Sequence, residues 1–301
     1  MAWPSLQKFL TGGIVLEVSR IPKQKDGKPQ LQEMEAPALT FCAKGNITAW
    51  KNATNVIDND MVMSQCNRST SQEAIDCIEE KTYSLNDTIK SAFHDIMQPK
   101  SIMNASHWSQ NFGSPYLGMC HTFIYPKKLK ADMLADGLVF QLDPELSYKV
   151  ILHDPKYLLM ASNPLVFPRI WREYKSRDLK PNKFEWLYIS LTEHRLLNRP
   201  DQPCEEDIPD YDFMECVKTS QARDVGCRPG WDNWSDTTHP ICTTMEQLRM
   251  HEELDWAIYN YELKIVVNKT GCRVPCMYKQ FAIVGEPQGG SATPLGKIAD
   301  K

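Results

Sequence analysis

The stretch from Cys204 to Cys276 constrains the fold more than any other part of the chain. It holds six cysteines, which are Cys204, Cys216, Cys227, Cys242, Cys272 and Cys276. Six cysteines in this order can be nested as three loops, one inside another, and such a nest joins two segments that are distant in sequence at a common base. We call this stretch the clamp. The rest of the chain is predicted to be the body on which the clamp is mounted.

The cysteine content and the glycosylation patterns indicate the same kind of compartment. The chain has ten cysteines and seven Asn-X-Ser/Thr patterns, whose acceptors are Asn46, Asn52, Asn67, Asn86, Asn104, Asn233 and Asn268. One such pattern is weak evidence, but seven beside ten cysteines favour an oxidising, glycan-adding compartment. The alternative is a cytosolic protein with free thiols.

Length, charge and hydrophobic patterning limit the possible domain number, partners and membrane segments. The 301 residues, 42% of them apolar, suffice for one large domain or two ordinary ones. The net charge of -4 gives no electrostatic signal for nucleic acid, and we interpret the short cluster Lys127, Lys128 and Lys130 as solvated surface. No run approaches the roughly 20 apolar residues of a membrane helix, and Leu6–Val18 is a poor signal-peptide core. We therefore expect the chain to be part of a longer protein.

The strongest helical pattern lies between Thr70 and Met97. Thr70 with Glu73 has the spacing of a capping box, and Ser84 with Asp87 repeats it more weakly. After these start signals come four apolar residues at helical spacing, which are Leu85, Ile89, Phe93 and Ile96. The pattern predicts two or three helices, whose apolar face packs on their own protein or binds a partner helix.

Strand signals follow and precede this region. The predicted strands are Ala36–Cys42, Gly137–Leu142, Ser147–His153, Phe184–Leu191 and Tyr261–Val267, and Ser19–Glu35 is expected to be an exposed connector or hairpin. Inside the clamp, Asp210–Ala222 and Thr243–Leu254 are predicted helices, the first followed by Gly226 and the second opened by a capping box of Thr243 with Glu246. The expected architecture is α+β: helices, then sheet, then a disulfide-bound helical pair.

Three groups of residues could form a chemical site or could have only a structural role. Metal binding could use Cys272 and Cys276 with His239 and His251, but the glycosylation patterns favour disulfides, so no metal or other cofactor is expected. The pairs His94-Asp95 and His153-Asp154 lack a recognisable nucleophile, so no enzyme is predicted. The aromatic residues that could form a sugar-binding or partner surface, or cover a small core, are Trp231, Trp234, Tyr259 and Tyr261.

Five motifs in a fixed order carry a resemblance to a known family. They are APALTFC (Ala36–Cys42), GMCHTFIYP (Gly118–Pro126), YKVILHDP (Tyr148–Pro155), TEHRLLNRPDQPC (Thr192–Cys204) and the clamp ending in GCRVPC. Through them the chain resembles, over roughly Ala36–Phe281, the extracellular region of the degenerin / epithelial sodium channel superfamily, and most closely its acid-sensing and arthropod pickpocket-type members. The first four motifs are weak singly; in this order and with the clamp they are specific.

The resemblance implies a hand-like ectodomain with a β-sheet palm and ball, a helical finger and knuckle, and a disulfide-rich thumb. The expected divisions are a juxtamembrane remnant and connector (1–35), a first palm strand with finger and knuckle (36–119), palm and ball strands (120–202), the thumb (203–276), and a truncated, incomplete palm with an atypical tail (277–301). The resemblance also implies disulfides Cys42–Cys120, Cys204–Cys276, Cys216–Cys272 and Cys227–Cys242, which leaves Cys66 with Cys77.

Two departures limit what the resemblance implies. Some relatives carry a tryptophan two residues before the first thumb cysteine, where it contacts the first membrane helix, but this chain has Gln202. The chain also lacks two of the five thumb bridges of the acid-sensing members, so proton gating is not expected to follow from the resemblance.

The resemblance therefore implies a subunit of a ligand- or stimulus-gated, amiloride-sensitive sodium channel. Its partners would be sodium ions, related subunits in a homo- or hetero-trimer, and an extracellular ligand, on the outer side of the plasma membrane. Both pore helices are expected to be missing from this chain. The alternative is a secreted or shed glycoprotein that binds a ligand or a subunit without conducting, and a hydrolase built on the His-Asp pairs is a third hypothesis.

Overall fold

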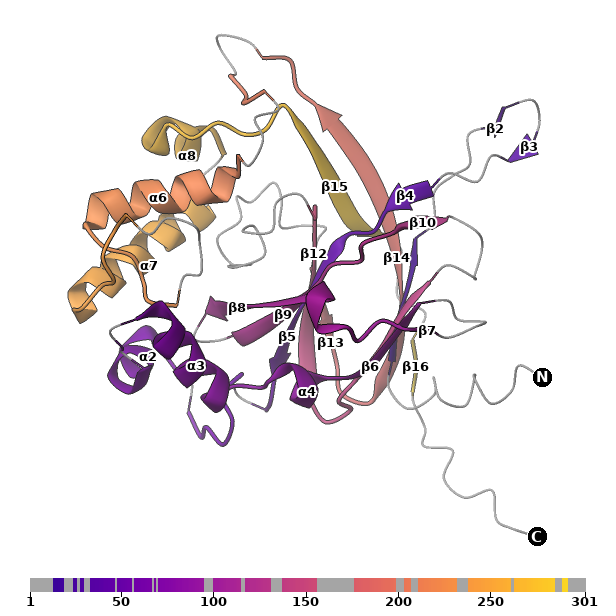
Figure 1. Cartoon of the computed structure of the whole chain (residues 1–301), viewed down its shortest axis with the longest axis horizontal. Helices are drawn as coiled ribbons and strands as arrows, with labels where there is room; N and C mark the ends of the chain where they lie inside the picture. Colours follow the sequence, from indigo (N-terminus) through magenta and orange to yellow (C-terminus); the bar gives the residue numbers. More distant parts are fainter. Residues whose placement is uncertain are drawn as a thin grey trace.

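The structure is a computed structural model that describes most of the chain. The described residues are 13–18, 24–25, 28–29, 33–46, 48–55, 57–66, 68, 70–94, 100–114, 117–130, 137–155, 176–198, 203–206, 211–231, 238–260, 263–284 and 289–291. Within them the fold is α+β, as predicted, with sheets that are largely antiparallel, six α-helices and five disulfides. Figure 1 shows the sheets on one side and two groups of helices on the other.

The larger sheet has seven strands drawn from both ends of the chain. They are β1 (Gly13–Val18), β6 (Ile89–His94), β7 (Lys100–Ser101), β11 (Leu138–Leu142), β14 (Lys183–Arg195), β15 (Met277–Val284) and β16 (Gly289–Ser291). Their order is β15-β14-β1-β11-β6-β7, and β16 also pairs with β14. Strand β1 therefore lies in the middle, parallel to β14 and antiparallel to β11.

The smaller sheet has five strands in the order β13-β12-β5-β9-β8. They are β5 (Ala38–Lys44), β8 (Trp108–Ser114), β9 (Gly118–Phe123), β12 (Ser147–His153) and β13 (Ser176–Leu179). Two short antiparallel pairs, the hairpin of β2 (Gln24–Lys25) with β3 (Lys28–Pro29) and the long-range pair of β4 (Glu33–Glu35) with β10 (Lys128–Lys130), complete the described strands. Cys42 and Cys120 are directly opposed on β5 and β9, and their disulfide joins these strands.

An aromatic cluster forms the centre of the main core. Phe140 of β11 lies with its ring centroid 4.9 Å from that of Phe41 on β5 and 5.3 Å from that of Phe123 on β9. Trp108 packs against the same rings, and the three phenylalanines are fully buried. Because β11 belongs to the larger sheet and β5 and β9 to the smaller, this cluster packs the two sheets together.

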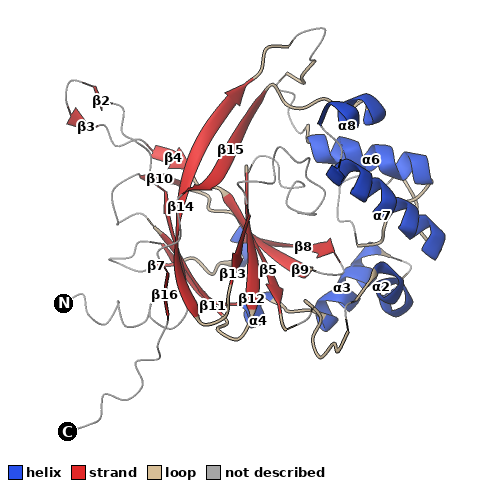
Figure 2. Cartoon of the chain, turned by 180° about the vertical axis from the view of Figure 1, so that it is seen from behind, coloured by secondary structure: helices blue, strands red, loops and turns tan. Residues whose placement is uncertain are grey.

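Five of the six described α-helices form two groups, visible from both sides in Figures 1 and 2, and the sixth, α4 (Leu85–Thr88), lies apart from them directly before β6. The other five are α2 (Asn59–Cys66), α3 (Ser71–Lys81), α6 (Phe213–Val225), α7 (Met245–Asn260) and α8 (Leu263–Thr270), with a 3-10 turn η1 (Ala105–His107). Helices α2 and α3 lie beside the ends of β8 and β9. Helices α6, α7 and α8 belong to the clamp, which contains three described helices instead of the predicted pair.

Three predicted signals for helix ends, those of Thr70, Ser84 and Gly226, are confirmed, although α6 begins and ends three residues later than the predicted helix. The Thr70 side chain accepts a hydrogen bond from the Glu73 amide, and Ser84 with Asp87 forms a complete capping box. Helix α6 ends at Gly226, whose φ of 84° is the left-handed conformation that glycine adopts at low cost. The start of α7 is displaced by one residue from the prediction, since Thr244 and Gln247, not Thr243 and Glu246, exchange the capping hydrogen bonds.

The helical prediction for Leu85–Ile96 is wrong beyond the first turn. The capping box of Ser84 starts only the four-residue helix α4, and Ile89–His94 continues as strand β6 between β11 and β7. Ile89 and Ala92 are buried in the main core through this pairing. The apolar spacing fitted a helix, but hydrogen bonding to two neighbouring strands outweighs a local periodicity.

The strand prediction for Tyr261–Val267 is also wrong. Leu263–Thr270 forms helix α8, which buries Val266 and packs Val267 against the clamp core. Residues 261 and 262 lie outside the described residues. A run rich in β-branched side chains is helical here because the disulfide at Cys272 and the left-handed Gly271 fix its end.

Both ends of the chain contribute strands to the larger sheet. Gly13–Val18, predicted as part of a juxtamembrane remnant, forms the central strand β1. Part of the predicted tail is paired as well, because β15 continues through Val284 and Gly289–Ser291 forms β16 against β14.

The capping box at α4 yields a prediction about pH. The ammonium group of Lys51 lies 2.7 Å from the Asp87 carboxylate, and this hydrogen bond, helped by those from Ser84, lowers the pKa of Asp87 from 3.8 to about 2. A carboxyl group with a lowered folded-state pKa stabilises the fold above its unfolded pKa, and the contribution is lost as the pH falls toward 2. Asp87→Asn should therefore lower stability at neutral pH, and its effect should disappear as the pH falls below about 2.

Urea unfolding of both proteins across this pH range measures the difference. The effect at neutral pH should be small, since the carboxylate is partly exposed and solvent screens the ion pair. Asp178→Asn is the control, because its side chain is 83% exposed and its contact to Lys149 is long, at 3.6 Å. A pH-independent difference for Asp87→Asn would contradict the assignment.

Candidate functional site: the clamp and its attachments

The clamp enters and leaves the larger sheet at one point. Cys204 is joined to Cys276, and the amide of Glu205 donates to the carbonyl oxygen of Val274 at 2.7 Å, while the amide of Cys276 donates to the carbonyl oxygen of Glu205 at 2.8 Å. The amide of Leu196, directly after β14, donates to the carbonyl oxygen of Cys276, directly before β15. Backbone hydrogen bonds therefore connect the β14–β15 ribbon to the base of the clamp.

A second bridge and a small core make the base rigid. Cys216 on α6 is joined to Cys272 just after α8. Around the two bridges pack buried side chains of α6, α8 and the returning chain, which are Phe213, Met214, Val217, Val266 and Val274. With two covalent links and a shared core, the base is expected to move as a unit.

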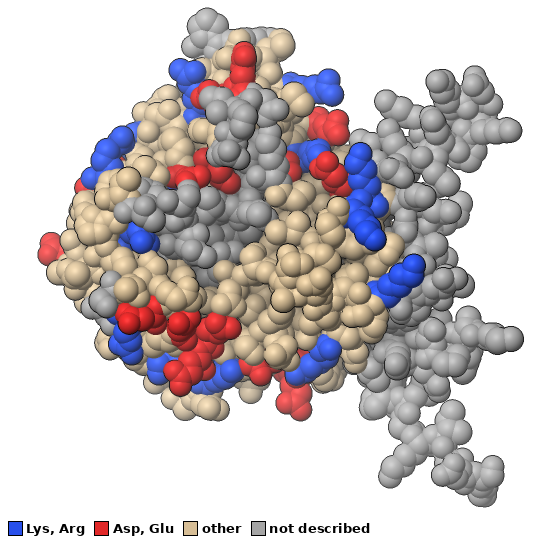
Figure 3. Space-filling view, in the orientation of Figure 1, with Lys and Arg blue, Asp and Glu red and all other residues tan. Residues whose placement is uncertain are grey.

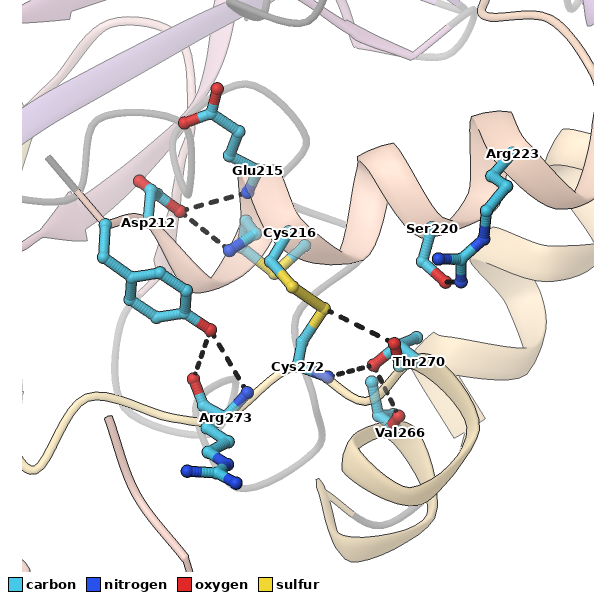
Figure 4. Close-up of a disulfide and its surroundings, with 11 residues drawn as sticks. Asp212, Glu215, Cys216, Ser220, Arg223, Val266, Thr270, Cys272 and Arg273 are labelled. Carbon is cyan, nitrogen blue, oxygen red and sulfur yellow. Dashed lines mark hydrogen bonds between the residues drawn. A yellow bond between two sulfur atoms is a disulfide. The ribbon is translucent and has the colours of Figure 1, made fainter. Parts of the chain in front are cut away.

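The start of α6 is attached to the returning chain by side chains as well. The hydroxyl of Tyr211 accepts a hydrogen bond from the Arg273 amide at 3.1 Å and donates one to the Arg273 carbonyl oxygen at 2.6 Å. Partial burial raises the pKa of Tyr211, so the hydroxyl stays protonated and able to donate. Figure 4 shows Arg273 next to Cys272. It also shows Asp212 at the first turn of α6.

Asp212 caps α6 and carries a prediction. One carboxylate oxygen accepts hydrogen bonds from the amides of Met214 and Glu215, at 2.7 and 3.3 Å. Loss of such a cap typically costs about 1 kcal/mol, so Asp212→Ala should destabilise the protein by about that amount. Asp212→Asn is the matched control, because asparagine caps helices equally well and should retain most of the stability. Thermal unfolding measures both, and equal losses in the two variants would contradict a capping role.

The two long helices of the clamp are joined by a largely buried ion pair. The ammonium group of Lys218 on α6 lies 3.0 Å from a carboxylate oxygen of Asp255 on α7, and the amide group of Gln221 donates to the same oxygen at 2.9 Å. Only 7% of the Lys218 side chain is exposed, so the pair is strongly shielded from solvent. Removing or displacing one partner would leave a buried, unpaired charge. This cost favours the one packing of α6 against α7 in which the two groups meet.

The far end of the clamp contacts helices α2 and α3. The Cys227–Cys242 bridge packs with Leu248 against Met63 of α2, and Arg228 donates to the hydroxyl of Ser71 at 2.9 Å. Arg249 on α7 forms an ion pair with Asp60 on α2. Acidic side chains gather in the region of α2 and α3 in Figure 3, whereas charges of both signs are interspersed elsewhere on this face. The clamp thus has two attachments, one to the β14–β15 ribbon and one to α2 and α3.

All ten cysteines are in disulfides, in the four pairs that the resemblance implies and in the pair Cys66–Cys77, which was left by elimination. The sulfurs of Cys227 and Cys242 lie within 4.8 Å of a ring nitrogen of His251, a ligand set that would suit a metal. These sulfurs are bonded to each other, and the imidazole Nε2 of His251 lies 2.8 Å from the Cys227 carbonyl oxygen. The arrangement is a disulfide with a packed histidine.

The described residues of the two His-Asp pairs lie in different sheets, His94 in the larger and His153 in the smaller. The His94 ring packs on Tyr125, and Asp95 lies outside the described residues. His153 is buried at the end of β12, and Asp154 accepts a hydrogen bond from the Lys279 amide of β15 at 2.9 Å. These positions attach strands to one another.

Of the aromatic candidates, Trp231 packs between α3 and the far end of the clamp. Trp234 and Tyr261 lie outside the described residues, as does the side chain of Tyr259. The glycan acceptors that the structure describes are all exposed, namely Asn46, Asn52, Asn86, Asn104 and Asn268, and the remaining two, Asn67 and Asn233, lie outside the described residues.

Sequence reasoning found the bridges of the clamp but missed its side-chain attachments. Lys218 and Asp255 are 37 residues apart, and Arg249 and Asp60 are 189 apart. Charged residues at such separations give no local signal. The Tyr211 contact to Arg273 is similarly remote, at 62 residues.

No protein-family model matches the chain, and no curated protein is significantly similar to it. Among the helices that the structure describes, none is long and apolar enough to cross a membrane.

Proposed function

We propose that the chain is the extracellular region of a subunit of a stimulus-gated sodium channel of the degenerin / epithelial sodium channel type. The observation that carries the proposal is the set of disulfides: eight cysteines form the four pairs that the family resemblance implies, and the remaining two, Cys66 and Cys77, pair with each other. The nested bridges of the clamp, mounted on a strand pair, are the most specific part of this set. The ordered sequence motifs support the same proposal.

In this proposal, the parts of the hand correspond to parts of the fold. The seven-stranded sheet would be the palm, the five-stranded sheet the ball, helices α2 to α4 the finger and knuckle, and the clamp the thumb. The channel would be a trimer of related subunits around a sodium-selective, amiloride-sensitive pore in the plasma membrane. Membrane helices that the described residues do not include would form that pore.

The two attachments of the clamp suggest how a stimulus would be passed on. A ligand that displaces the far end from α2 and α3 would rotate a body held rigid by two bridges and the buried pair Lys218–Asp255. The rotation would reach the β14–β15 ribbon through the Cys204–Cys276 bridge. Rigid-body rotation about a packed interface is a common form of such switching.

The first test is the gene itself. Transcripts containing this frame should encode an apolar run of about 20 residues upstream and another downstream. A secretion signal in place of both runs would contradict the channel proposal and favour the soluble glycoprotein, which would bind a ligand or a subunit.

The second test is electrical recording of the complete subunit in oocytes. We expect a sodium current that amiloride blocks, and we expect Arg249→Ala to alter its response to the stimulus, because this side chain joins the clamp to α2. The matched control is Arg223→Ala, since Arg223 is exposed and its ion pair is with the adjacent Asp224. Absence of any sodium current at normal surface abundance would contradict the proposal.

A further inference from the structure

The glycosylation pattern Asn268–Thr270 lies at the end of α8, directly beside a bridge of the clamp. The asparagine side chain is exposed and the hydroxyl of the pattern belongs to Thr270. Cys272, joined to Cys216 on α6, follows two residues later. Figure 4 shows Thr270, Cys272 and Val266 grouped around this bridge.

In the folded chain, the Thr270 hydroxyl, which a glycan transferase must recognise, is already hydrogen-bonded within the protein. The hydroxyl of Thr270 donates to the Val266 carbonyl oxygen at 2.8 Å and accepts from the Cys272 amide at 3.2 Å. A threonine hydroxyl has a single proton to donate, so its donor is already used. In the folded clamp, Asn268 is therefore exposed, but the threonine hydroxyl of its glycosylation pattern is not available for recognition.

This arrangement depends on the bridge. Helix α8 has eight residues, and an isolated helix of that length is marginal in water. It is held at its end by the Cys216–Cys272 bridge and by the left-handed Gly271, and it buries Val266 in the clamp core. With the bridge open, the last turn of α8 is expected to fray and to release the Thr270 hydroxyl.

Folding hides some of the other glycosylation patterns and leaves others exposed. Thr54 and Ser106 are exposed, so the patterns of Asn52 and Asn104 stay open after folding. Thr48 and Thr88 are buried, so the patterns of Asn46 and Asn86 are hidden in the folded protein. All of these lie within the first 106 residues of the chain.

The order of synthesis separates Asn268 from the early hidden patterns. The Cys42–Cys120 bridge beside Asn46 cannot close until Cys120 has entered the compartment, which is 120 − 46 = 74 residues after Asn46. The Cys216–Cys272 bridge can close as soon as Cys272 arrives, which is 272 − 268 = 4 residues after Asn268. Asn46 thus has a long interval for modification, and Asn268 has almost none before bridge closure begins to compete.

We propose that Asn268 is a conditional glycan acceptor, modified only in chains whose Cys216–Cys272 bridge is still open. In the transfer, the Asn268 amide nitrogen bonds to the anomeric carbon of a lipid-linked oligosaccharide diphosphate, the bond from that carbon to the phosphate oxygen breaks, and the amide proton passes to a base of the transferase. In the competing step, the two thiols give two electrons and two protons to the disulfide of an oxidoreductase, which becomes a dithiol. The inference rests on the extracellular placement in the proposed function.

The test compares the occupied fraction of each acceptor in secreting cells, measured by peptide mass spectrometry after glycan removal in heavy-oxygen water. In the wild-type chain, Asn268 should be occupied in a smaller fraction than Asn104. In Cys216→Ser/Cys272→Ser, occupancy of Asn268 should rise to that of Asn104. The matched control is Cys227→Ser/Cys242→Ser, which opens the other end of the clamp and should leave Asn268 as in the wild type.

Cell-retained material is included, because glycans are added during synthesis and early folding, so the measurement does not require a variant that completes folding. Brief dithiothreitol treatment of cells making the wild-type chain should reproduce the rise at Asn268. Full occupancy of Asn268 in the wild type, or no rise when the bridge is removed, would overturn the inference while leaving the proposed function standing. If Asn52 and Asn104 also carry no glycan, the extracellular placement itself fails, and the inference with it.

Discussion

Phe140→Ala is expected to destabilise the protein by about 4 kcal/mol, the usual range for truncating a buried phenylalanine. The Phe140 side chain is fully buried, and its ring contacts those of Phe41, Phe123 and Trp108. Because these rings come from both sheets, truncation would open a cavity in the buried interface between the two sheets. Urea unfolding followed by tryptophan fluorescence measures the loss, and hydrogen exchange should show reduced protection of β6 and β11 first.

Phe140→Leu is the control for this prediction. Leucine refills part of the space and should cost much less than alanine. Equal losses for the two substitutions would mean that the effect does not come from the cavity. A loss below about 1 kcal/mol for Phe140→Ala would contradict the central position of this ring, because well-packed aromatic residues rarely cost so little.

Removal of the outermost bridge, by Cys204→Ser/Cys276→Ser, is expected to have the second large effect. The bridge closes a loop of 72 residues, for which the chain-entropy relation gives about 4 kcal/mol. Both cysteines are buried, so the change also disturbs packing at the clamp base. Hydrogen exchange should show loss of protection in α6 and α8, while the five-stranded sheet keeps its protection.

The matched control is Cys227→Ser/Cys242→Ser, which opens a loop of only 15 residues. The same relation gives about 3 kcal/mol for it, and the loss of protection should be confined to the far end of the clamp beside Met63. A larger destabilisation from the short bridge, or a loss spread over the sheets from the long one, would contradict the assignment of the base to Cys204 and Cys276.

Local chemistry predicted many element boundaries well. Ser147–His153 was predicted as a strand and forms β12 with those bounds. The end of α6 follows from Gly226, because a left-handed glycine acts within one turn of the backbone, whereas its start, capped by Asp212, lies three residues after the predicted one. Where structure is decided within a few residues, the sequence pattern was sufficient.

The failures occur where distant partners decide. Ile89–His94 is a strand because β11, some 50 residues later, pairs with it through contacts such as Ser91 with Gln141. Leu263–Thr270 is a helix because α6 and a bridge hold it. The central position of β1 likewise depends on β11 and β14, and its own sequence carries no sign of either.

The candidate site divides in the same way. The cysteine spacing and the family resemblance together implied every bridge, because covalent links leave a strong pattern in the sequence. The contacts that orient the clamp depend on Arg249, Asp60, Lys218 and Asp255, which are ordinary charged residues until the fold brings them together. Their roles could be recognised only in three dimensions.

The long strand β14 has a mechanical consequence. Its 13 residues span about 43 Å, with β1 bonded along its first part and β15 along its last, next to the clamp. A tensile load along β14 would stress these hydrogen bonds in shear, all at once, whereas a sideways load would only bend a two-stranded ribbon. We therefore expect the ribbon to be stiff to stretching and compliant to bending, so that the clamp can swing at the end of β14 without being pulled away from the sheet.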